Sequence, residues 1–269
     1  MIDYYARIAP ALLPHLRDRP LTLKRYPNGV EESFFYEKRC PSHRPPWVET
    51  APIWSGRKEG EIDYCLCNDR ATLIWLAQLA AIELHPSLSR AKPIERPTVL
   101  AFDLDPGPPA DIVDCCRVGL RLRQLFEGLG LECFPKTSGS KGLQVYVPLN
   151  TDIAYDDTKP FAQAVAQAME RSDPELVVSR MAKELRRGKV FVDWSQNDQH
   201  KTTVAVYSLR ARERPTVSTP VDWDEVEHAA EEEDPDLLRF ESHDVVKRVE
   251  QDGDLFAPVL ELRQGLPER

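Results

Sequence analysis

The hydrophobic and polar positions of residues 21–26 alternate with a period of two, which is typical of a β-strand. The segment runs into Asn28-Gly29, a dipeptide that supplies the positive φ angles of a tight hairpin turn. Residues 30–39 are then predicted to form the returning strand, with three adjacent aromatic residues and two cations near its end. The pattern thus predicts a β-hairpin that carries both aromatic and cationic side chains.

The rest of the chain mixes helical and strand patterns. Residues 71–84 are apolar on most sides and hold no helix breaker, and Asp69 can cap their first turn, so we expect a buried helix there. Asp111 can cap another helix that ends at Gly128 or Gly130. The pattern also predicts helices at 158–171 and 175–187, and strands at 98–104, 131–134, 143–149, 190–194 and 201–209. Because hairpins and crossovers occur together, the expected fold class is α+β.

The composition is that of an ordinary soluble protein. The 269 residues include 35 Lys+Arg and 44 Asp+Glu, a net charge of −9, and 42% are hydrophobic. This apolar content argues against intrinsic disorder, and 12 Gly exclude a collagen-like chain. No apolar run approaches the ~20 residues that span a bilayer, and the N-terminus lacks a signal-peptide pattern. We therefore expect a soluble, cytoplasmic protein with no membrane partner, and its length allows one large domain or two small ones.

The cysteine and histidine residues do not form a metal-ligand pattern. Cys65 and Cys67 could point to one face of a strand, but no C-x-x-C or partner pair follows them. Reduced, mostly buried thiols are therefore favoured over a zinc site for the six cysteines. His85 would follow the helix at 71–84, where a cation is favourable, so a capping role is expected for it.

The first indication of a metal site comes from two aspartates. Asp103 and Asp105 lie two apart, so on a strand both point to one face while Phe102 and Leu104 point to the other. Two carboxylates at that range repel each other, and a divalent cation between them removes the conflict. The competing interpretation is a simple turn, because Asp before Pro and Gly is common at strand ends.

A third aspartate strengthens the metal hypothesis. Asp193 lies inside the apolar segment 190–194, where an unpaired charge is costly. It could face solvent or pair with Lys189 or Arg187. On a strand beside the other two aspartates it would instead complete the three-carboxylate site of two-metal phosphoryl transfer.

Other segments could bind phosphate or nucleic acid. The loop at 138–142, Ser-Gly-Ser-Lys-Gly, could offer hydroxyl and N–H groups to a phosphate, although it lacks P-loop spacing and also fits a plain exposed hairpin loop. Arg210 could bind a triphosphate through two parallel hydrogen bonds. In the hairpin at 21–39, aromatic rings could stack on bases while cations contact phosphates. Because Phe34 and Phe35 are adjacent, they point to opposite faces, and at least one is expected in the core.

Several segments, taken together, resemble a known family. They are Leu23-Lys24-Arg25-Tyr26-Pro27-Asn28-Gly29, Phe34-Phe35-Tyr36-Glu37-Lys38, Ile82-Glu83-Leu84-His85-Pro86, Phe102-Asp103-Leu104-Asp105-Pro106, Thr137-Ser138-Gly139-Ser140-Lys141-Gly142-Leu143, Val192-Asp193-Trp194, Lys201-Thr202-Thr203-Val204-Ala205 and Tyr207-Ser208-Leu209-Arg210. In this order, from about residue 20 to Pro258, they resemble the polymerase domain of bacterial ligase D, of the archaeo-eukaryotic primase superfamily.

The resemblance implies a single primase-polymerase domain over residues 1–269, with central β-sheets flanked by helices, an N-terminal helical extension at 1–20 and no ligase or nuclease segment. It implies a nucleotidyltransferase that adds NTPs or dNTPs, with ribonucleotides preferred, to a DNA 3′-hydroxyl at gaps or broken ends that carry a 5′-phosphate. Two Mn²⁺ or Mg²⁺ ions would be the cofactors. Implied partners are DNA, Ku and a separate ligase, for a nucleoid-associated monomer.

The resemblance also implies roles for individual residues. As catalytic residues and metal ligands it implies Asp103, Asp105 and Asp193. As nucleotide-binding residues it implies Ser138, Ser140, Lys141, Gln144, Thr202 and Arg210. As DNA-binding residues it implies Lys24, Arg25, Phe34, Phe35 and Lys38.

The sequence departs from the family at two positions. Gln144 stands where a His is usual, which keeps a hydrogen-bond donor but loses any positive charge, and Val206 stands where a Pro is usual. These departures leave open a catalytically weakened or inactive DNA-end-binding module of the same fold. A further alternative, a D-x-D glycosyltransferase, would leave Asp193 and the hairpin without a role.

Overall fold

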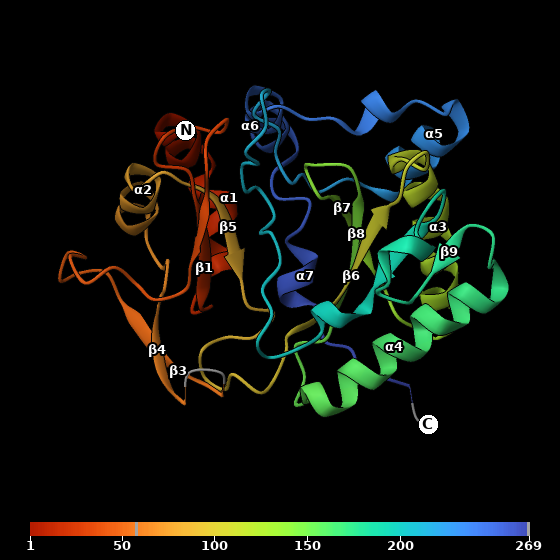
Figure 1. Ribbon diagram of the computed structural model, residues 1–269, viewed down its shortest axis with the longest axis horizontal. Helices are drawn as coiled ribbons and strands as arrows, with labels where there is room; N and C mark the ends of the chain where they lie inside the picture. Colours follow the sequence, from red (N-terminus) through yellow and green to blue (C-terminus); the bar gives the residue numbers. More distant parts are fainter. Residues whose placement is uncertain (57–58, 268–269) are drawn as a thin grey trace. The chain divides into compact units, whose positions relative to one another are not determined.

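The computed structural model describes residues 1–56 and 59–267. Its backbone contacts divide the chain into two compact units, each assembled from three separate segments. Unit 1 consists of Met1–Arg96, Gln199–Ser218 and Phe240–Asp254, and unit 2 consists of Pro97–Asp198, Thr219–Arg239 and Leu255–Arg269. Figure 1 labels most helices and strands of both units. Helices occur together with one antiparallel and one mixed sheet, which confirms the α+β class.

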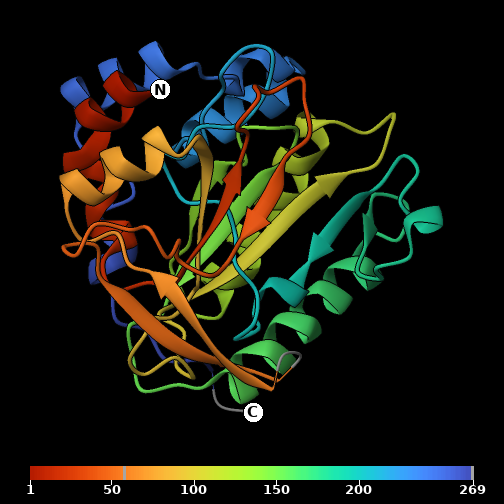
Figure 2. The same ribbon diagram turned by 60° about the vertical axis from the view of Figure 1, so that its left-hand side comes forward.

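Unit 1 is built on a five-stranded antiparallel sheet. Its strand order is β2-β1-β4-β3, and β5 also pairs with β1. The long strands β3 and β4 run side by side as a hairpin (Figure 2). The elements of this unit are α1 (Ile2–Leu16), β1 (Leu21–Arg25), β2 (Phe35–Glu37), β3 (Thr50–Ser55), β4 (Gly60–Cys65), α2 (Arg70–Gln78), β5 (Ala81–Pro86) and α6 (Ser242–Asp252). The predicted extension at 1–20 forms α1, which packs against α2 and α6 and buries Tyr5 and Leu12.

Two predictions for unit 1 were wrong in detail. The helix expected at 71–84 ends at Gln78, although Asp69 caps it as predicted. The chain reverses at Ala80, which has a φ of 57°, and continues as β5, because hydrogen bonding to β1 outweighs the local helical preference. The expected tight turn between β1 and β2 is a longer connection, since Arg25 already pairs with Phe35.

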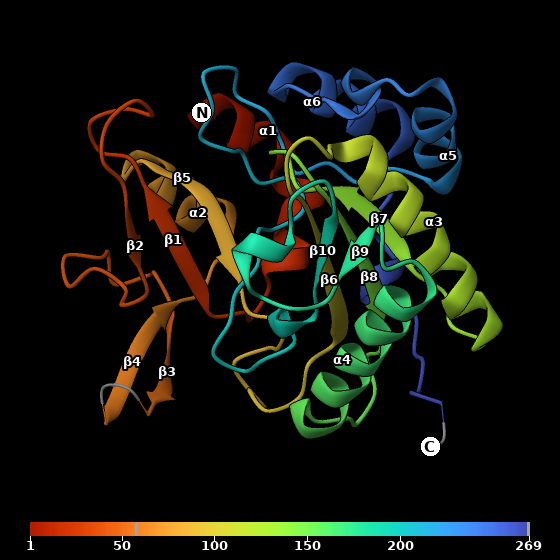
Figure 3. The ribbon, with the colours of Figure 1, turned by 45° about the vertical axis from the view of Figure 1, so that its right-hand side comes forward.

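Unit 2 contains a second five-stranded sheet, of order β7-β8-β6-β10-β9. Its elements are β6 (Val99–Pro106), α3 (Ile112–Gly128), β7 (Phe134–Thr137), β8 (Leu143–Pro148), α4 (Tyr155–Ser172), β9 (Val177–Val178), η1 (Lys183–Leu185), β10 (Val190–Asp193), η2 (Trp194–Gln196), α5 (Trp223–Glu232), η3 (Pro235–Leu238) and α7 (Pro258–Glu261). Helices α3 and α4 lie along this sheet (Figure 3). The rings of Phe102 on β6 and Phe126 on α3 are 5.5 Å apart, so the apolar face of β6 packs against α3. Asp103 and Asp105 lie on the opposite, polar face of β6.

Three further predictions need correction. Residues 175–187 form the short strand β9 and the 3-10 turn η1 in place of a helix, because Val177 and Val178 pair with β10. The predicted strand at 201–209 is an irregular segment that donates backbone hydrogen bonds to β5, from Ala205 N–H to the Leu84 carbonyl at 2.9 Å. The strand predicted at 131–134 lies at Phe134–Thr137.

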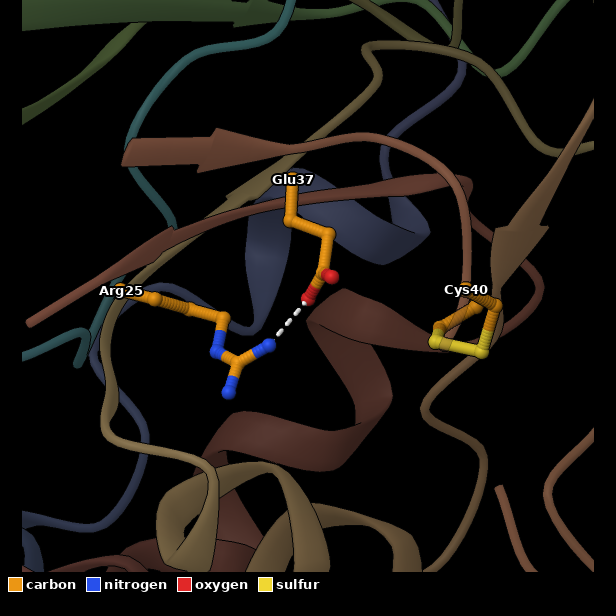
Figure 4. Close-up of a disulfide and its surroundings, with 4 residues drawn as sticks. Arg25, Glu37 and Cys40 are labelled. Atoms are coloured by element: carbon orange, nitrogen blue, oxygen red, sulfur yellow. Dashed lines mark hydrogen bonds and ion pairs between the residues drawn. A yellow bond between two sulfur atoms is a disulfide. The ribbon is translucent and has the colours of Figure 1, made fainter. Parts of the chain in front are cut away.

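The cysteines were also predicted wrongly in one respect. Cys40 and Cys65 form a disulfide between the segment that follows β2 and the end of β4 (Figure 4). The two residues are 25 positions apart in sequence, and the Cys40 N–H donates to the Asp63 carbonyl at 2.7 Å, which brings the segments together. The four remaining cysteines are buried free thiols. Within residues 1–56 and 59–267, no helix has the length and apolar character needed to span a membrane.

Candidate active site

A row of four polar residues crosses the sheet of unit 2 on one face. Lys136 on β7 pairs with Gln144 on β8, Gln144 pairs with Asp103 on β6, and Asp103 pairs with Asp193 on β10. Directly opposed residues of antiparallel strands have Cβ atoms roughly 5 Å apart. Asp105 lies two residues along β6 and therefore on the same face. The prediction that Asp193 lies on a strand next to Asp103 and Asp105 is confirmed.

Asp103 is the most strongly perturbed acid of this row. Its Oδ1 is buried and has no hydrogen-bond partner. Burial and the nearby charge of Asp105 raise the pKa of Asp103 to about 7, and Asp193 acts in the same direction. The hydrogen bond from Gln144 and the charge of Lys136 oppose this increase. A carboxylate in this setting gains stability from a cation that binds its free oxygen.

Asp193 is held by its own neighbours. Its Oδ1 accepts hydrogen bonds from the Ser195 backbone N–H at 2.9 Å and the Ser195 hydroxyl at 2.6 Å, and its Oδ2 accepts one from Gln196 Nε2 at 2.8 Å. An ionised carboxylate has about four acceptor positions, so one remains for a cation. In the part of the chain that the structure describes, no group of three or more His, Cys, Asp or Glu side chains forms a ready metal site.

The residues nevertheless fit a hard divalent cation. The donors are carboxylate oxygens, which Mg²⁺ and Mn²⁺ prefer. The buried and unpartnered Oδ1 of Asp103 is the observation that supports this fit.

The predicted phosphate loop joins β7 to β8 beside this row. The Ser138 hydroxyl accepts the backbone N–H groups of Ser140 at 3.2 Å and Gly142 at 3.1 Å, so these two amides point into the loop. Gly142 is required here, because a Cβ would lie 2.1 Å from the Leu104 carbonyl oxygen. Ser138 is buried, whereas Ser140 and Lys141 are exposed. The exposed side chains, more than the backbone amides, are therefore available to a ligand.

A different row crosses the sheet of unit 1. Tyr36 on β2, Lys24 on β1 and Glu83 on β5 occupy adjacent positions. Glu83 is only 2% exposed. Its Oε1 lies 3.2 Å from Lys24 Nζ, 3.4 Å from the Tyr26 hydroxyl and 3.3 Å from the Ala211 N–H nitrogen, and its Oε2 lies 3.3 Å from Arg210 Nε and 3.1 Å from His85 Nε2. One buried carboxylate thus contacts side chains of β1 and β5 and the two residues that follow the irregular segment.

These contacts determine the charge of the cluster around Glu83. Burial alone would raise the pKa of Glu83, but the hydrogen bond from His85 and the charges of Arg210 and Lys24 lower it to about 2. Burial lowers the pKa of His85, and Arg210 and Lys24 act in the same direction, while Glu83 opposes them. Because the ionised Glu83 only accepts, His85 Nε2 donates to it. The expectation of a helix-capping role was wrong, since His85 lies on β5.

The aromatic residues of the hairpin surround Lys24. Its Nζ lies 4.2 Å from the ring centre of Phe34, 5.2 Å from that of Tyr26 and 5.9 Å from that of Tyr36. Phe34 and Tyr36 are 48% and 58% exposed. Lys24 itself is only 14% exposed at its side chain, so the rings present most of this surface.

The other predicted DNA-binding residues are also near the surface of unit 1. Phe35 is 43% exposed and lies 5.2 Å from the Arg25 guanidinium, which pairs with Glu37 at 2.8 Å (Figure 4). Lys38 is exposed. The expectation that Phe34 or Phe35 belongs to the core was wrong, because β2 is an edge strand that leaves both rings at the surface.

The structure thus brings the predicted residues together in two sets. In unit 2 lie Asp103, Asp105, Asp193, Ser138, Ser140, Lys141 and Gln144, and in unit 1 lie Thr202, Arg210, Lys24, Arg25, Phe34, Phe35 and Lys38. Sequence reasoning missed Lys136 and Glu83. Lys136 is fully buried, and only the strand register reveals that it shares a face with the aspartates. Glu83 was missed because residues 81–84 were assigned to a helix. On a strand at 81–86, its position as a charged residue among buried neighbours would have been recognised.

Comparisons with known proteins agree with this arrangement. The LigD primase-polymerase domain family matches residues 1–256. The chain is 42% identical over 261 residues to the multifunctional non-homologous end joining protein LigD of Mycolicibacterium smegmatis, covering 96% of this chain and 33% of that protein. It is 30% identical over 253 residues to the bifunctional protein LigD of Bacillus subtilis, covering 94% and 39%. The chain thus spans about a third of the length of these relatives.

A solved structure is also similar. The polymerase domain of Mycobacterium tuberculosis ligase D, determined in complex with DNA, superimposes with a TM-score of 0.89 at 40% identity, covering 98% of this chain and 92% of that one. These matches argue against a glycosyltransferase, and they confirm the resemblance inferred from the sequence motifs. The chain belongs to the LigD primase-polymerase domain family, and its fold is that of a polymerase-type nucleotidyltransferase.

Proposed function

We propose that this protein adds nucleotides to a DNA 3′-hydroxyl, at gaps or at broken ends with a 5′-phosphate, during DNA repair. The observation that carries the proposal is the acidic row of unit 2. Asp103 and Asp193 lie directly opposite each other with Asp105 on the same face, and the buried Oδ1 of Asp103 has no hydrogen-bond partner. The similarity to the polymerase domain of ligase D supplies the class of reaction.

The three aspartates would hold two Mn²⁺ or Mg²⁺ ions. When bound, such ions lower the pKa of the attacking 3′-hydroxyl and neutralise charge on the leaving pyrophosphate. The protein keeps two of the aspartates in place before any ligand arrives. Gln144 donates a hydrogen bond to Asp103, and Ser195 and Gln196 donate to Asp193. Such pre-organisation lowers the reorganisation needed during the reaction.

The remaining polar residues are proposed to bind the substrates. We assign the incoming triphosphate to Ser138, Ser140, Lys141, Gln144, Thr202 and Arg210, and the DNA to Lys24, Arg25, Phe34, Phe35 and Lys38. Ribonucleotides are the proposed preferred substrates. We further propose a monomer that acts at the nucleoid in the cytoplasm, together with Ku and a DNA ligase activity.

Primer extension on a gapped duplex tests the proposal. The wild-type protein should incorporate nucleotides on a 5′-phosphorylated gap, with Mn²⁺ or Mg²⁺ and with rNTPs better than dNTPs. Asp103→Asn and Asp193→Asn should each lower the extension rate about 10³-fold or more, as the loss of a catalytic group does. Asp224→Asn, the same change at an exposed helix position of unit 2, is the control and should extend at the wild-type rate. Wild-type rates in either site variant would remove the assignment.

A second candidate is a DNA-end-binding module without catalysis. It is favoured by Gln144 at the centre of the row and by the three hydrogen bonds that already occupy Asp193. The same experiment separates the two candidates. Binding of the gapped duplex without incorporation of any NTP or dNTP, in either metal, would support the module and exclude the polymerase.

A further inference from the structure

Glu83 is a buried ion that the proposed chemistry does not use. It is 2% exposed, lies in unit 1 and does not belong to the acidic row of Asp103, Asp105 and Asp193. Yet its carboxylate contacts Lys24, which is proposed to bind DNA, and Arg210, which is proposed to bind the triphosphate. A single side chain therefore connects two proposed ligand-binding cations.

The contact with Lys24 is fixed by the strand register. Lys24 and Glu83 occupy paired positions on β1 and β5, with Nζ and Oε1 at 3.2 Å. On the other side of Lys24, Tyr36 pairs with it from β2, and the ring of Phe34 lies 4.2 Å from Nζ. The ammonium group is therefore held between a carboxylate and aromatic rings, and a lysine side chain, which is otherwise flexible, has a defined position.

The contact with Arg210 has a different structural origin. Arg210 directly follows the irregular segment at 201–209, and its backbone N–H donates to the Thr216 carbonyl at 2.8 Å. Glu83 adds two further contacts, because Oε2 lies 3.3 Å from Arg210 Nε and Oε1 accepts the backbone N–H of Ala211 at 3.3 Å. Two positions earlier, the Ser208 hydroxyl accepts the Leu84 N–H at 2.9 Å. Neighbouring residues of β5 thus fix both the side chain of Arg210 and the backbone on either side of it.

The charges argue that this role is positional. Lys24 and Arg210 carry two positive charges against the single negative charge of Glu83, which keeps its pKa at about 2. A carboxylate beneath two cations lowers the positive potential that attracts an anion. By charge alone, Glu83 would therefore weaken the binding of phosphate groups. Its contribution is to fix the orientation of the Lys24 and Arg210 side chains, which lowers the entropy cost of ordering them when a ligand binds.

We propose that Glu83 is a positioning residue that presents Lys24 and Arg210, in a fixed mutual orientation, to the phosphate groups of the nucleotide and the DNA. This inference rests on the proposed function. Its predicted result is the opposite of the result expected from the change in charge alone. Removing the negative charge should weaken nucleotide binding, although it makes the surroundings of Lys24 and Arg210 more positive.

Steady-state incorporation of ATP opposite template dT, on a 5′-phosphorylated gapped duplex with Mn²⁺, tests this. Glu83→Gln should raise the KM for ATP about tenfold or more, as expected when a buried ion pair that orients a ligand-binding cation is lost. Glu83→Asp, which keeps the charge but shortens the side chain, should have an intermediate KM. Glu61→Gln makes the same charge change at an exposed position of the same sheet and should keep the wild-type KM. Circular dichroism reports whether each variant is folded.

A double-mutant cycle separates positioning from a general effect on folding. Arg210→Met should raise the KM strongly in the wild-type background and much less in the Glu83→Gln background, because Arg210 has already lost its ion pair with Glu83 there. If Glu83→Gln does not fold, Glu83→Asp decides by the same KM criterion.

A KM for ATP equal to or below that of wild type in the folded Glu83 variants would overturn the inference and leave the proposed function intact. A wild-type protein that neither binds nor incorporates ATP would overturn both.

Discussion

Glu83 in unit 1 and Asp103 in unit 2 are both enclosed carboxylates that belong to a cross-strand row, yet their pKa values move in opposite directions. Around Glu83 the hydrogen bond from His85 and the charges of Arg210 and of Lys24, its partner in the row, lower the pKa to about 2. Around Asp103, burial comes with Asp105 and Asp193, so its pKa rises to about 7. Burial is common to both, and the sign of the neighbouring charges decides the outcome.

The difference identifies which carboxylate is structural and which is prepared for a ligand. All cations that Glu83 needs are part of the protein, and breaking that set leaves uncompensated charge in the interior. Asp103 has an excess of acids around it and a buried oxygen without a partner. A cation from outside the chain would offset these charges, as the proposed function requires.

The largest expected effect is on stability, from replacing each acid by a leucine. Glu83→Leu should lower the free energy of unfolding by about 3–5 kcal/mol, because Lys24 and Arg210 lose their counter-ion. Asp103→Leu, at pH 8 without divalent cations, should cost far less or stabilise the protein, because it removes a repelled charge. Urea titrations followed by circular dichroism measure both changes. Equal losses from the two substitutions would contradict the contrast.

The next largest expected effect is a pH dependence of the free energy of unfolding that is caused by Asp103. Its pKa is about 7 in the folded protein and 3.8 in the reference state, so between these values the folded protein binds more protons. The free energy of unfolding should therefore fall as the pH rises from about 4 to 7, by on the order of 3 kcal/mol. Glu83, with its pKa lowered from 4.5 to about 2, keeps its full contribution above about pH 5 and loses it as the pH falls toward 2.

The pKa of His85 is lowered, so this residue makes the free energy of unfolding rise with pH below its ordinary pKa, opposite to the effect of Asp103. The quantity to measure is therefore a difference between the wild-type protein and a variant. The free energy of unfolding of wild type minus that of Asp103→Asn, in the presence of a chelator, isolates Asp103. This difference should fall steadily across pH 4 to 7. A flat difference would show that Asp103 is not crowded by charge in the folded protein.

Divalent cations should bind at Asp103 and not at Glu83. Because Mn²⁺ would bind the folded acidic row and not the unfolded chain, it should stabilise the wild-type protein by about 2.7 kcal/mol at a hundred times its dissociation constant. Asp103→Asn should lose most of this stabilisation, whereas Glu61→Gln should retain it. Thermal denaturation with increasing MnCl₂ measures the effect at fixed pH. An Asp103→Asn protein that responds like wild type would place the cation elsewhere.

The contrast also shows how far the sequence could predict the structure. The acidic row was predictable, because alternation on a strand places Asp103 and Asp105 on one face and the apolar run around Asp193 indicates a neighbouring strand. The cluster around Glu83 was not, because residues 71–84 look helical until the pairing of β5 with β1 is known. The same holds for the disulfide of Cys40 and Cys65. Both features depend on contacts between residues far apart in sequence, which a local pattern cannot predict.

The smallest predicted effect concerns the aromatic surface over Lys24. Phe34→Leu removes the ring 4.2 Å from Lys24 Nζ, and Phe35→Leu removes a ring 5.2 Å from Arg25. Cation–π contacts at exposed sites contribute about 0.5–1 kcal/mol, so Phe34→Leu should lower the free energy of unfolding by that amount. Phe35→Leu should lower it less, because its partner is farther away. Urea titrations at low and high salt measure the difference, and a larger loss for Phe35→Leu would mean that the Phe34 ring does not help to hold Lys24 against Glu83.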